Sequence, residues 1–154
     1  MNQDAGQTKK ILLVDDEESI LGITEAMLKR IAEKYDLTFD IISSSDAVHV
    51  LYDLVHQKKD DFDLIFMDVR MPKVCGEEIY RSMELMDSKG QDKVVFVTAY
   101  PEDLIDAIFG VKLRILRKPF HLRDVEKIVV RMFDLDSEHK DDDEPWETLE
   151  NKVY

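Results

Sequence analysis

Three aspartates, Asp15, Asp16 and Asp68, are the residues of this chain best placed to do chemistry. They stand directly after the apolar runs at 11–14 and 64–67, and each run has the length of a short buried β-strand. In open parallel sheets the ligand site lies just beyond the carboxyl ends of the strands. Three carboxylates that converge there repel one another unless a divalent metal ion or a lysine neutralises them, so we expect a pocket for a hard cation.

Two further polar residues are expected at the same rim. Thr98 ends a fourth apolar run, and Lys118, which Pro119 follows, ends a fifth. In a doubly wound sheet with strand order 2-1-3-4-5, strands 1, 3, 4 and 5 are neighbours. Acids, a hydroxyl and an ammonium group therefore meet at one edge.

This combination suits phosphoryl transfer. Asp16 and Asp68 are the best direct ligands for Mg²⁺, and Asp15 binds the ion directly or through water. Asp68 also offers an oxygen as a nucleophile toward phosphorus, which would form an acyl phosphate. Lys118 and Mg²⁺ would offset charge on the transferring group, and Thr98 would donate a hydrogen bond to a phosphoryl oxygen.

Strand-like and helix-like segments alternate along the chain and supply the frame for these residues. Five βα units in sequence predict an α/β fold with a five-stranded parallel sheet in the order 2-1-3-4-5 and helices on both faces. The expected strands are residues 10–14, 37–42, 64–67, 93–98 and 114–117. The expected helices are residues 19–34, 47–54, 76–89, 101–111 and 122–133.

Composition limits the class of protein. With 154 residues and 44% hydrophobic content, the chain has room for one core of ordinary domain size. The formal net charge of −13 argues against nucleic acid as a direct partner, because phosphate backbones are bound by clustered Lys and Arg. The single cysteine, Cys75, excludes an internal disulfide. No segment approaches about 20 consecutive apolar residues, and we expect a soluble cytoplasmic protein with no membrane contact.

The ends of the chain differ from its centre. We expect a disordered N-terminus at 1–8, one domain at 9–133 and an acidic tail at 134–154, which holds nine acidic residues and two lysines. Two interpretations of the tail stay open. It is solvated and disordered, or Pro145, Trp146 and the apolar residues after them form a short helix at 145–153 that docks on this domain or on a partner.

Four motifs stand at the strand ends in this order: VDDE (14–17), FMDVRMP (66–72) with Gly76, VTAY (97–100) and KPF (118–120). Together they resemble the receiver domain of bacterial two-component response regulators, which has the flavodoxin-like fold of the chemotaxis regulator. The resemblance covers about residues 9–133.

The resemblance implies a role for each motif residue. Asp68 would be the phospho-acceptor, Thr98 the switch hydroxyl and Lys118 the phosphate-contacting lysine. Asp15 and Asp16 would form the acidic pair, and the metal would be bound by Asp15, Asp16, Asp68 and the backbone carbonyl of Arg70. The family also implies a cis peptide bond between Lys118 and Pro119.

The chain departs from the family pattern at one position. The family usually has an aromatic residue three positions before its lysine, and this chain has Ile115 there. Arg70 and Tyr100 lie two residues after Asp68 and Thr98, where the family tunes dephosphorylation by controlling the approach of water. Because both side chains are bulky, we expect a long-lived phosphoryl state.

Three classes of function follow. The first is a phosphoryl-accepting response regulator in which Asp68 receives phosphate from a histidine kinase or phosphotransfer protein and binding to a partner protein changes. Such a protein is an enzyme at most toward its own phosphorylation and dephosphorylation. The second is a phosphorylation-independent interaction module with the receiver fold. The third is a Mg²⁺-dependent aspartyl phosphohydrolase, which is disfavoured because such enzymes carry Asp-x-Asp after the first strand.

The tail after Phe133 contains no basic helix-turn-helix and no second set of strands. We therefore expect a stand-alone receiver whose output passes through a partner, and the alternative that the chain is a fragment of a longer protein with an effector domain stays open. Homodimerisation through the fourth and fifth helices, which is common in the family, stays open.

Overall fold

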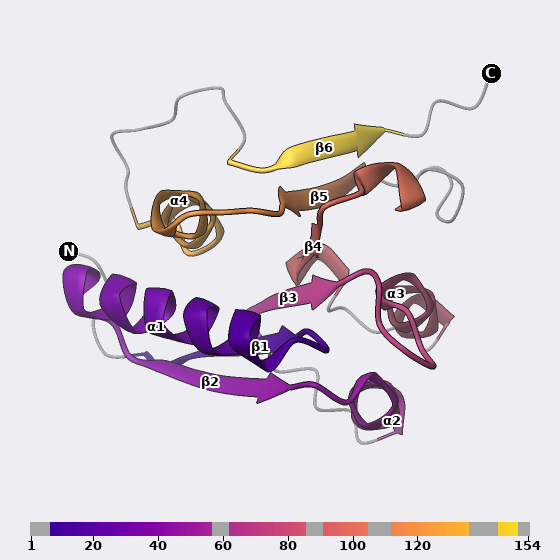
Figure 1. The fold of residues 1–154 in the computed structure, drawn as a ribbon. Coiled ribbons are helices and arrows are strands. Elements are labelled where there is room, and N and C mark those ends of the chain that lie inside the picture. Colours follow the sequence, from indigo (N-terminus) through magenta and orange to yellow (C-terminus); the bar gives the residue numbers. More distant parts are fainter. Residues whose placement is uncertain (1–6, 57–61, 86–90, 105–111, 136–144, 151–154) are drawn as a thin grey trace.

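The fold is a single twisted sheet covered by helices on both faces (Figure 1). The computed structural model describes residues 7–56, 62–85, 91–104, 112–135 and 145–150. The strands are β1 (Lys9–Val14), β2 (Phe39–Ser44), β3 (Leu64–Asp68), β4 (Val94–Thr98), β5 (Lys112–Arg117) and β6 (Glu147–Glu150). They are arranged in the order β2-β1-β3-β4-β5-β6.

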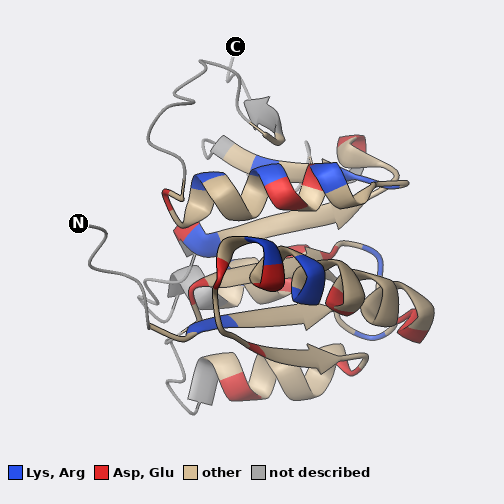
Figure 2. Cartoon of the chain, turned by 90° about the vertical axis from the view of Figure 1, so that its left-hand side faces the viewer, with Lys and Arg blue, Asp and Glu red and all other residues tan. Residues whose placement is uncertain are grey.

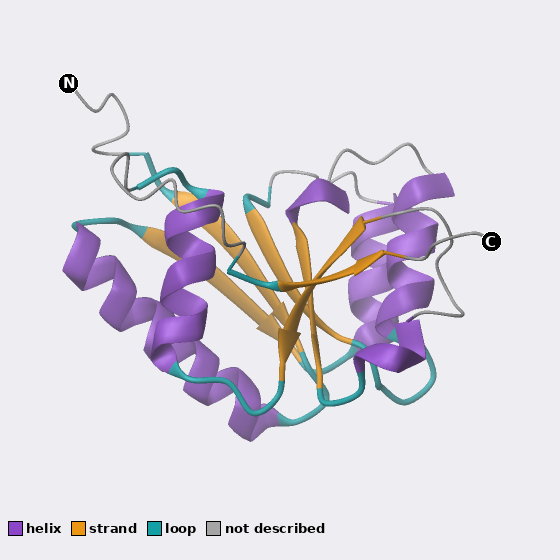
Figure 3. Ribbon diagram, turned by 90° about the horizontal axis from the view of Figure 1, so that it is seen from above, coloured by secondary structure: helices purple, strands orange, loops and turns teal. Residues whose placement is uncertain are grey.

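Four α-helices and two short 3₁₀ turns belong to the described residues. They are α1 (Glu18–Tyr35), α2 (Ala47–His56), α3 (Gly76–Leu85) and α4 (Leu122–Met132), with η1 (Gln91–Lys93) and η2 (Pro101–Leu104). Helices α1 and α4 cover one face of the sheet, and α2 and α3 cover the other (Figure 3). No described helix is long and apolar enough to cross a membrane.

The central strands β1, β3 and β4 are apolar except at their ends, and both faces of their apolar stretches are buried. In β1, Ile11 and Leu13 pack under α1 and α4, whereas Leu12 and Val14 pack under α2 and α3. Strands β3 and β4 are buried at all of their positions. Two-sided burial removes the polar/apolar alternation of a half-exposed strand and leaves continuous apolar runs. Charged residues lie mostly on the helices and at the strand ends (Figure 2).

The predicted fold class is confirmed. Strands β1 to β5 are parallel and follow the order 2-1-3-4-5. Each predicted strand has its counterpart within two residues at either end. The helix expected at 101–111 begins as the 3₁₀ turn η2, and its residues 105–111 lie outside the described part of the chain, as do 86–89 of the third helix.

The prediction of a helix at 145–153 is wrong for residues 147–150. These residues form β6, which pairs antiparallel with β5. An isolated helix of nine residues is marginal in water, whereas a strand at this place gains main-chain hydrogen bonds from the open edge of β5. Residues 1–6, 136–144 and 151–154 lie outside the described part, so the disorder expected at both ends remains a prediction there.

Gly76 allows α3 to begin directly against the end of β3. Its backbone N–H donates to the carbonyl oxygen of Val69 at 3.0 Å, and a Cβ at this position would lie 2.3 Å from the carbonyl oxygen of Asp68. No other residue type fits without moving the β3 end. The Asp68 backbone is therefore held in place by a contact that depends on glycine.

We predict that Gly76→Ala lowers the free energy of unfolding by about 1–3 kcal/mol, because the added methyl group overlaps backbone that cannot rotate away. Thermal or urea unfolding measures the change. Gly22→Ala is the matched control, because a Cβ on Gly22 meets no atom within 4 Å. That variant should gain about 0.5–1 kcal/mol from helix propensity. Equal effects of the two substitutions would contradict the steric argument.

Candidate functional site

The predicted residues of the rim come together at the carboxyl ends of four neighbouring strands. Asp15 follows β1, Asp68 is the last residue of β3, Thr98 is the last residue of β4, and Lys118 follows β5. Carboxylate oxygens of Asp15, Asp16 and Asp68 all lie within 4.8 Å of one another. The structure thus joins side chains that are up to 103 residues apart in sequence.

Lys118 links the two buried acids. Its Nζ lies 2.8 Å from Asp15 Oδ2 and 3.5 Å from Asp68 Oδ1. The other oxygen of Asp15 accepts a hydrogen bond from the backbone N–H of Glu17 at 2.9 Å. Asp15 is therefore held at both oxygens, while Asp68 makes the longer contact with the ammonium group.

The backbone around Lys118 aims its side chain into the rim. The N–H of Lys118 donates to the carbonyl oxygen of Thr98 at 2.9 Å, which extends the pairing of β4 with β5 by one residue. The peptide bond between Lys118 and Pro119 is cis, as the family resemblance implied. In the register of the sheet Asp68 is level with Val97 and Leu116, so Lys118 lies two residues further along at the carboxyl end of β5, and its side chain reaches the acids from there.

Burial makes the acidic cluster electrostatically costly. Asp15 and Asp68 are only 4% and 5% exposed. Burial, followed by the negative charge of Asp15, raises the pKa of Asp68 to about 7, and Lys118 opposes this rise only in part. Burial alone would lower the pKa of Lys118, but its hydrogen bond to Asp15 and the charge of Asp68 raise it, so Lys118 remains an ammonium ion at neutral pH.

The donor set fits a hard divalent cation. Three carboxylates face one ammonium group, and Asp16 is exposed, which leaves the cluster open to solvent on one side. Oxygen ligands with excess negative charge are what Mg²⁺ and Ca²⁺ prefer. Burial and the neighbouring carboxylates raise the pKa of Asp68 although Lys118 is present, so a further cation at the cluster would favour the ionised form of Asp68.

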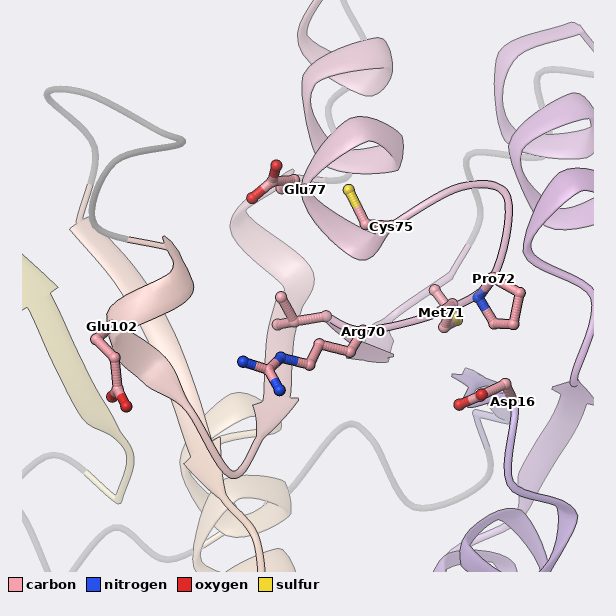
Figure 4. A pocket seen from close by; sticks show the side chains of 8 residues that line it. Asp16, Arg70, Met71, Pro72, Cys75, Glu77 and Glu102 are labelled. Atoms are coloured by element: carbon pink, nitrogen blue, oxygen red, sulfur yellow. The ribbon is translucent and has the colours of Figure 1, made fainter.

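An open cleft of about 980 Å³ lies beside the cluster, and Asp16 is the member of the cluster that lines it. In Figure 4, Asp16 lies on one side of this cleft, and Arg70 extends from the loop after β3 toward the side of Glu102. The Arg70 guanidinium lies 4.1 Å from the ring centroid of Tyr100, so the two bulky side chains that follow Asp68 and Thr98 contact each other. The remaining lining residues are Val69, Met71, Pro72, Cys75 and Glu77.

Thr98 and Ile115 are both buried, on neighbouring strands. The hydroxyl oxygen of Thr98, which is 2% exposed, accepts a hydrogen bond from the backbone N–H of Tyr100 at 3.0 Å. Ile115 is 1% exposed, lies opposite Phe96 in the pairing of β4 with β5, and belongs to the core under α2 and α3. The position at which the family pattern has an aromatic residue is filled here by an aliphatic core residue.

Sequence reasoning missed two acids of the cleft, Glu77 and Glu102. Glu77 lies in the first turn of α3 and Glu102 in η2, and nothing in their local sequence distinguishes them from other surface acids. Cys75 lines the same cleft. Burial raises the pKa of its thiol, which keeps it protonated at neutral pH and favours a structural role.

We predict that Asp68→Asn stabilises the protein in magnesium-free buffer above about pH 7. The pKa of Asp68 rises from 3.8 to about 7 on folding, so the folded state binds a proton that the unfolded state lacks between these values. The free energy of unfolding contributed by this group therefore falls as the pH rises through that window, by at most about 4 kcal/mol.

Urea unfolding across the window measures this effect. In Asp68→Asn the free energy of unfolding should no longer fall with pH across this window. In Asp63→Asn, which changes an acid just before the other end of β3, it should still fall. Parallel pH profiles for the wild type and Asp68→Asn would show that Asp68 is not desolvated as described.

Comparison with known proteins agrees with this geometry. The family model of the response regulator receiver domain matches residues 11–130. The alkaline phosphatase synthesis transcriptional regulatory protein PhoP of Bacillus subtilis is 33% identical over 144 residues, which are 88% of this chain and 55% of PhoP. An uncharacterized response regulatory protein of Shewanella oneidensis is 28% identical over 79% of this chain and 47% of its own length. The chain thus spans about half the length of these relatives.

Solved structures share the fold. The receiver domain of the sensor histidine kinase PA1611 of Pseudomonas aeruginosa, with a magnesium ion coordinated in its active site cleft, has a TM-score of 0.64 at 22% identity, and the match covers 83% of this chain and 99% of that one. The chemotaxis protein CheY4 of Vibrio cholerae has a TM-score of 0.63 at 23% identity, over 82% and 99%. The family match over most of the chain and the acidic rim lead to one conclusion: the chain belongs to the response regulator receiver domains of two-component systems.

Proposed function

We propose that this receiver domain accepts a phosphoryl group on Asp68 from a phosphohistidine of a sensor kinase or phosphotransfer protein, in a Mg²⁺-dependent reaction that changes its binding to a partner protein. The observation that carries the proposal is the placement of buried Asp68 beside Lys118 and Asp15, in an acidic cluster whose exposed member, Asp16, lines an open cleft. The domain resides in the cytoplasm and, given its net charge of −13, acts on a protein rather than on nucleic acid directly.

The transfer exchanges one bond to phosphorus for another. A carboxylate oxygen of Asp68 attacks the phosphorus, the new O–P bond forms, and the N–P bond to the donor imidazole breaks. The imidazole nitrogen keeps the electron pair of that bond and takes up a proton from solvent. The deprotonated form of Asp68 is the one that reacts, so neutralising the cluster must precede attack.

The acidic cluster is the place for the metal. Asp15, Asp16 and Asp68, with the backbone carbonyl of Arg70, would hold Mg²⁺, which when bound neutralises the carboxylates and the charge on the phosphoryl oxygens. The magnesium ion in the cleft of the Pseudomonas receiver domain supports this assignment. Asp16 is exposed, so an ion can enter without opening of the core.

Lys118 and Thr98 then act on the phosphorylated carboxylate. Lys118 already lies 3.5 Å from Asp68 Oδ1 and keeps its proton, so it is placed to pair with a phosphoryl oxygen. Thr98 can donate its hydroxyl hydrogen, because the bond from the Tyr100 N–H uses only an acceptor site of that oxygen. The domain turns over no separate substrate in this scheme, and its catalysis is limited to its own phosphorylation and dephosphorylation.

One observation favours a second candidate, a receiver-fold module that binds partners without phosphorylation. Ile115 is fully buried on β5, between β4 and β6, so the aromatic residue that moves in other family members has no counterpart at this position. In that case the acidic rim would bind a cation without receiving phosphate.

We predict that incubation with Mg²⁺ and acetyl phosphate adds one phosphate-sized mass to the intact protein. The adduct should be absent in Asp68→Asn and after removal of Mg²⁺ with a chelator, because the nucleophile or the neutralising cation is then missing. Asp63→Asn, which alters an acid just before the other end of β3, should leave labelling intact. A protein that gains no mass supports the phosphorylation-independent module, and continuous donor turnover without an adduct supports a hydrolase.

A second prediction concerns the lifetime of the phosphoryl group. Arg70, which lines the cleft, lies against the ring of Tyr100, and we infer that this pair restricts the approach of water to the phosphoryl group. An exposed cation–π pair is worth about 0.5–1 kcal/mol, so Arg70→Ala or Tyr100→Ala should speed dephosphorylation roughly 2- to 5-fold. The decay of the phosphorylated mass with time measures the rate, and Ile23→Ala, at an exposed position of α1, is the control. A wild-type half-life of seconds would contradict a shielded phosphoryl group.

A further inference from the structure

The sixth strand closes an edge that the parallel sheet would otherwise leave open. β5 pairs with β4 on one side, and on the other side it pairs with β6 in antiparallel orientation (Figures 1 and 3). Four residue pairs make up this contact: Lys112 with Glu150, Leu113 with Leu149, Arg114 with Thr148 and Ile115 with Glu147. The tail of the chain therefore occupies the main-chain hydrogen-bonding edge of β5.

The two strands have opposite charge. β5 reads KLRILR and carries three basic residues, whereas β6 reads ETLE and carries two glutamates. The register places Lys112 opposite Glu150, and unlike charges at opposite positions favour strand pairing. The segment at 136–144 that leads to β6 adds six acids and one lysine to the sequence. In sequence, the acidic β6 therefore complements the basic β5.

One aromatic residue anchors the tail. Trp146, which is half-buried, packs against the core under α1 and α4. The Arg114 guanidinium lies 5.1 Å from the centroid of its ring and also donates to the carbonyl oxygen of Asp92 in η1. Arg114 is thus held between η1 and the tail, and it presents a cationic surface on which an indole ring can stack.

The contact is small enough to exchange. The contact consists of four residue pairs and one aromatic side chain, which is shorter than a typical strand pairing. Even a complete two-stranded hairpin is only marginally stable in water. Attachment in the same chain compensates, because a short linker gives the tail an effective concentration in the millimolar range. A segment of similar chemistry in another protein can compete when its affinity or concentration is high enough.

We propose that the outer edge of β5 is a docking site for an extended acidic protein segment with an aromatic residue at its start, and that residues 146–150 fill this site within the same chain until a partner's segment replaces them. Recognition is by strand addition: main-chain hydrogen bonds give affinity, and the basic residues of β5 and the Trp146 position give specificity. The inference does not depend on phosphorylation of Asp68, because the unphosphorylated chain already shows the occupied edge.

The test uses the full chain and a dye-labelled peptide with the sequence EPWETLENKVY, which is residues 144–154. Fluorescence anisotropy measures binding to the wild type, to Trp146→Ala and to a double variant with Thr148→Pro and Leu149→Pro. Neighbouring strand residues direct their amides to opposite sides, so one of the two prolines removes an amide that faces β5. Both variants should bind the peptide at least about ten-fold more tightly than the wild type, because their own tails no longer compete.

Four checks separate docking from other effects. Ser137→Ala, between α4 and β6, should bind the peptide as weakly as the wild type, and a peptide with alanine in place of tryptophan should bind none of the proteins tightly. Circular dichroism checks that the variants keep the fold. Trp146 is the sole tryptophan of the chain, so its emission should be red-shifted in the double proline variant relative to the wild type.

Two results would overturn the proposal. Equal peptide affinity for the wild type and both variants would show that the tail does not occupy a strand-binding edge. A concentration-dependent dimer that Trp146→Ala disperses would show that β6 pairs with a second copy and not within its own chain.

Discussion

The site depends on the burial of like charges at the ends of neighbouring parallel strands. Asp15 and Asp68 lie almost out of solvent with one ammonium group between them, and this leaves the cluster short of positive charge. Burial first, and then the negative charge of Asp15, raise the pKa of Asp68. A structure that keeps such a cluster is less stable than one with neutral residues there, and the excess negative charge favours binding of a cation at the rim.

Several contacts at the base of the site hold this unfavourable cluster in place. Gly76 brings α3 against the Asp68 carbonyl, the backbone N–H of Glu17 holds one Asp15 oxygen, and the Lys118 amide continues the β4–β5 pairing. The strands beneath are packed on both faces, so the rim cannot relax by local movement of the backbone. Because the packed strands hold the carboxylates in place, their excess negative charge can be balanced only by a cation from solvent, which can reach the exposed Asp16.

The same strand that delivers Lys118 to the rim also meets the tail of the chain. β5 contacts β4 and the buried Thr98 on one side and β6 on the other, and Ile115 lies between them in the core. With an aliphatic residue buried there, the proposed docking of a partner at the outer edge of β5 would give an output that requires no aromatic side chain to move. The acidic strand β6 pairs with β5 along the stretch that contains Ile115, the residue that departs from the family pattern.

The sequence by itself determined the parallel five-stranded sheet and the residues of the rim. Continuous apolar runs mark strands buried on both faces, and polar residues that end such runs must lie at one edge when the strands are parallel. Only the tertiary structure decided which of these groups touch, that Arg70 stacks on Tyr100, that position 76 must lack a side chain and that residues 147–150 form a strand. These outcomes depend on contacts between segments that are distant in sequence. In the tail, the spacing of Trp146 and Leu149 is typical of a helix, but pairing with the open edge of β5 gives the segment main-chain hydrogen bonds as a strand. Local sequence does not reveal that edge.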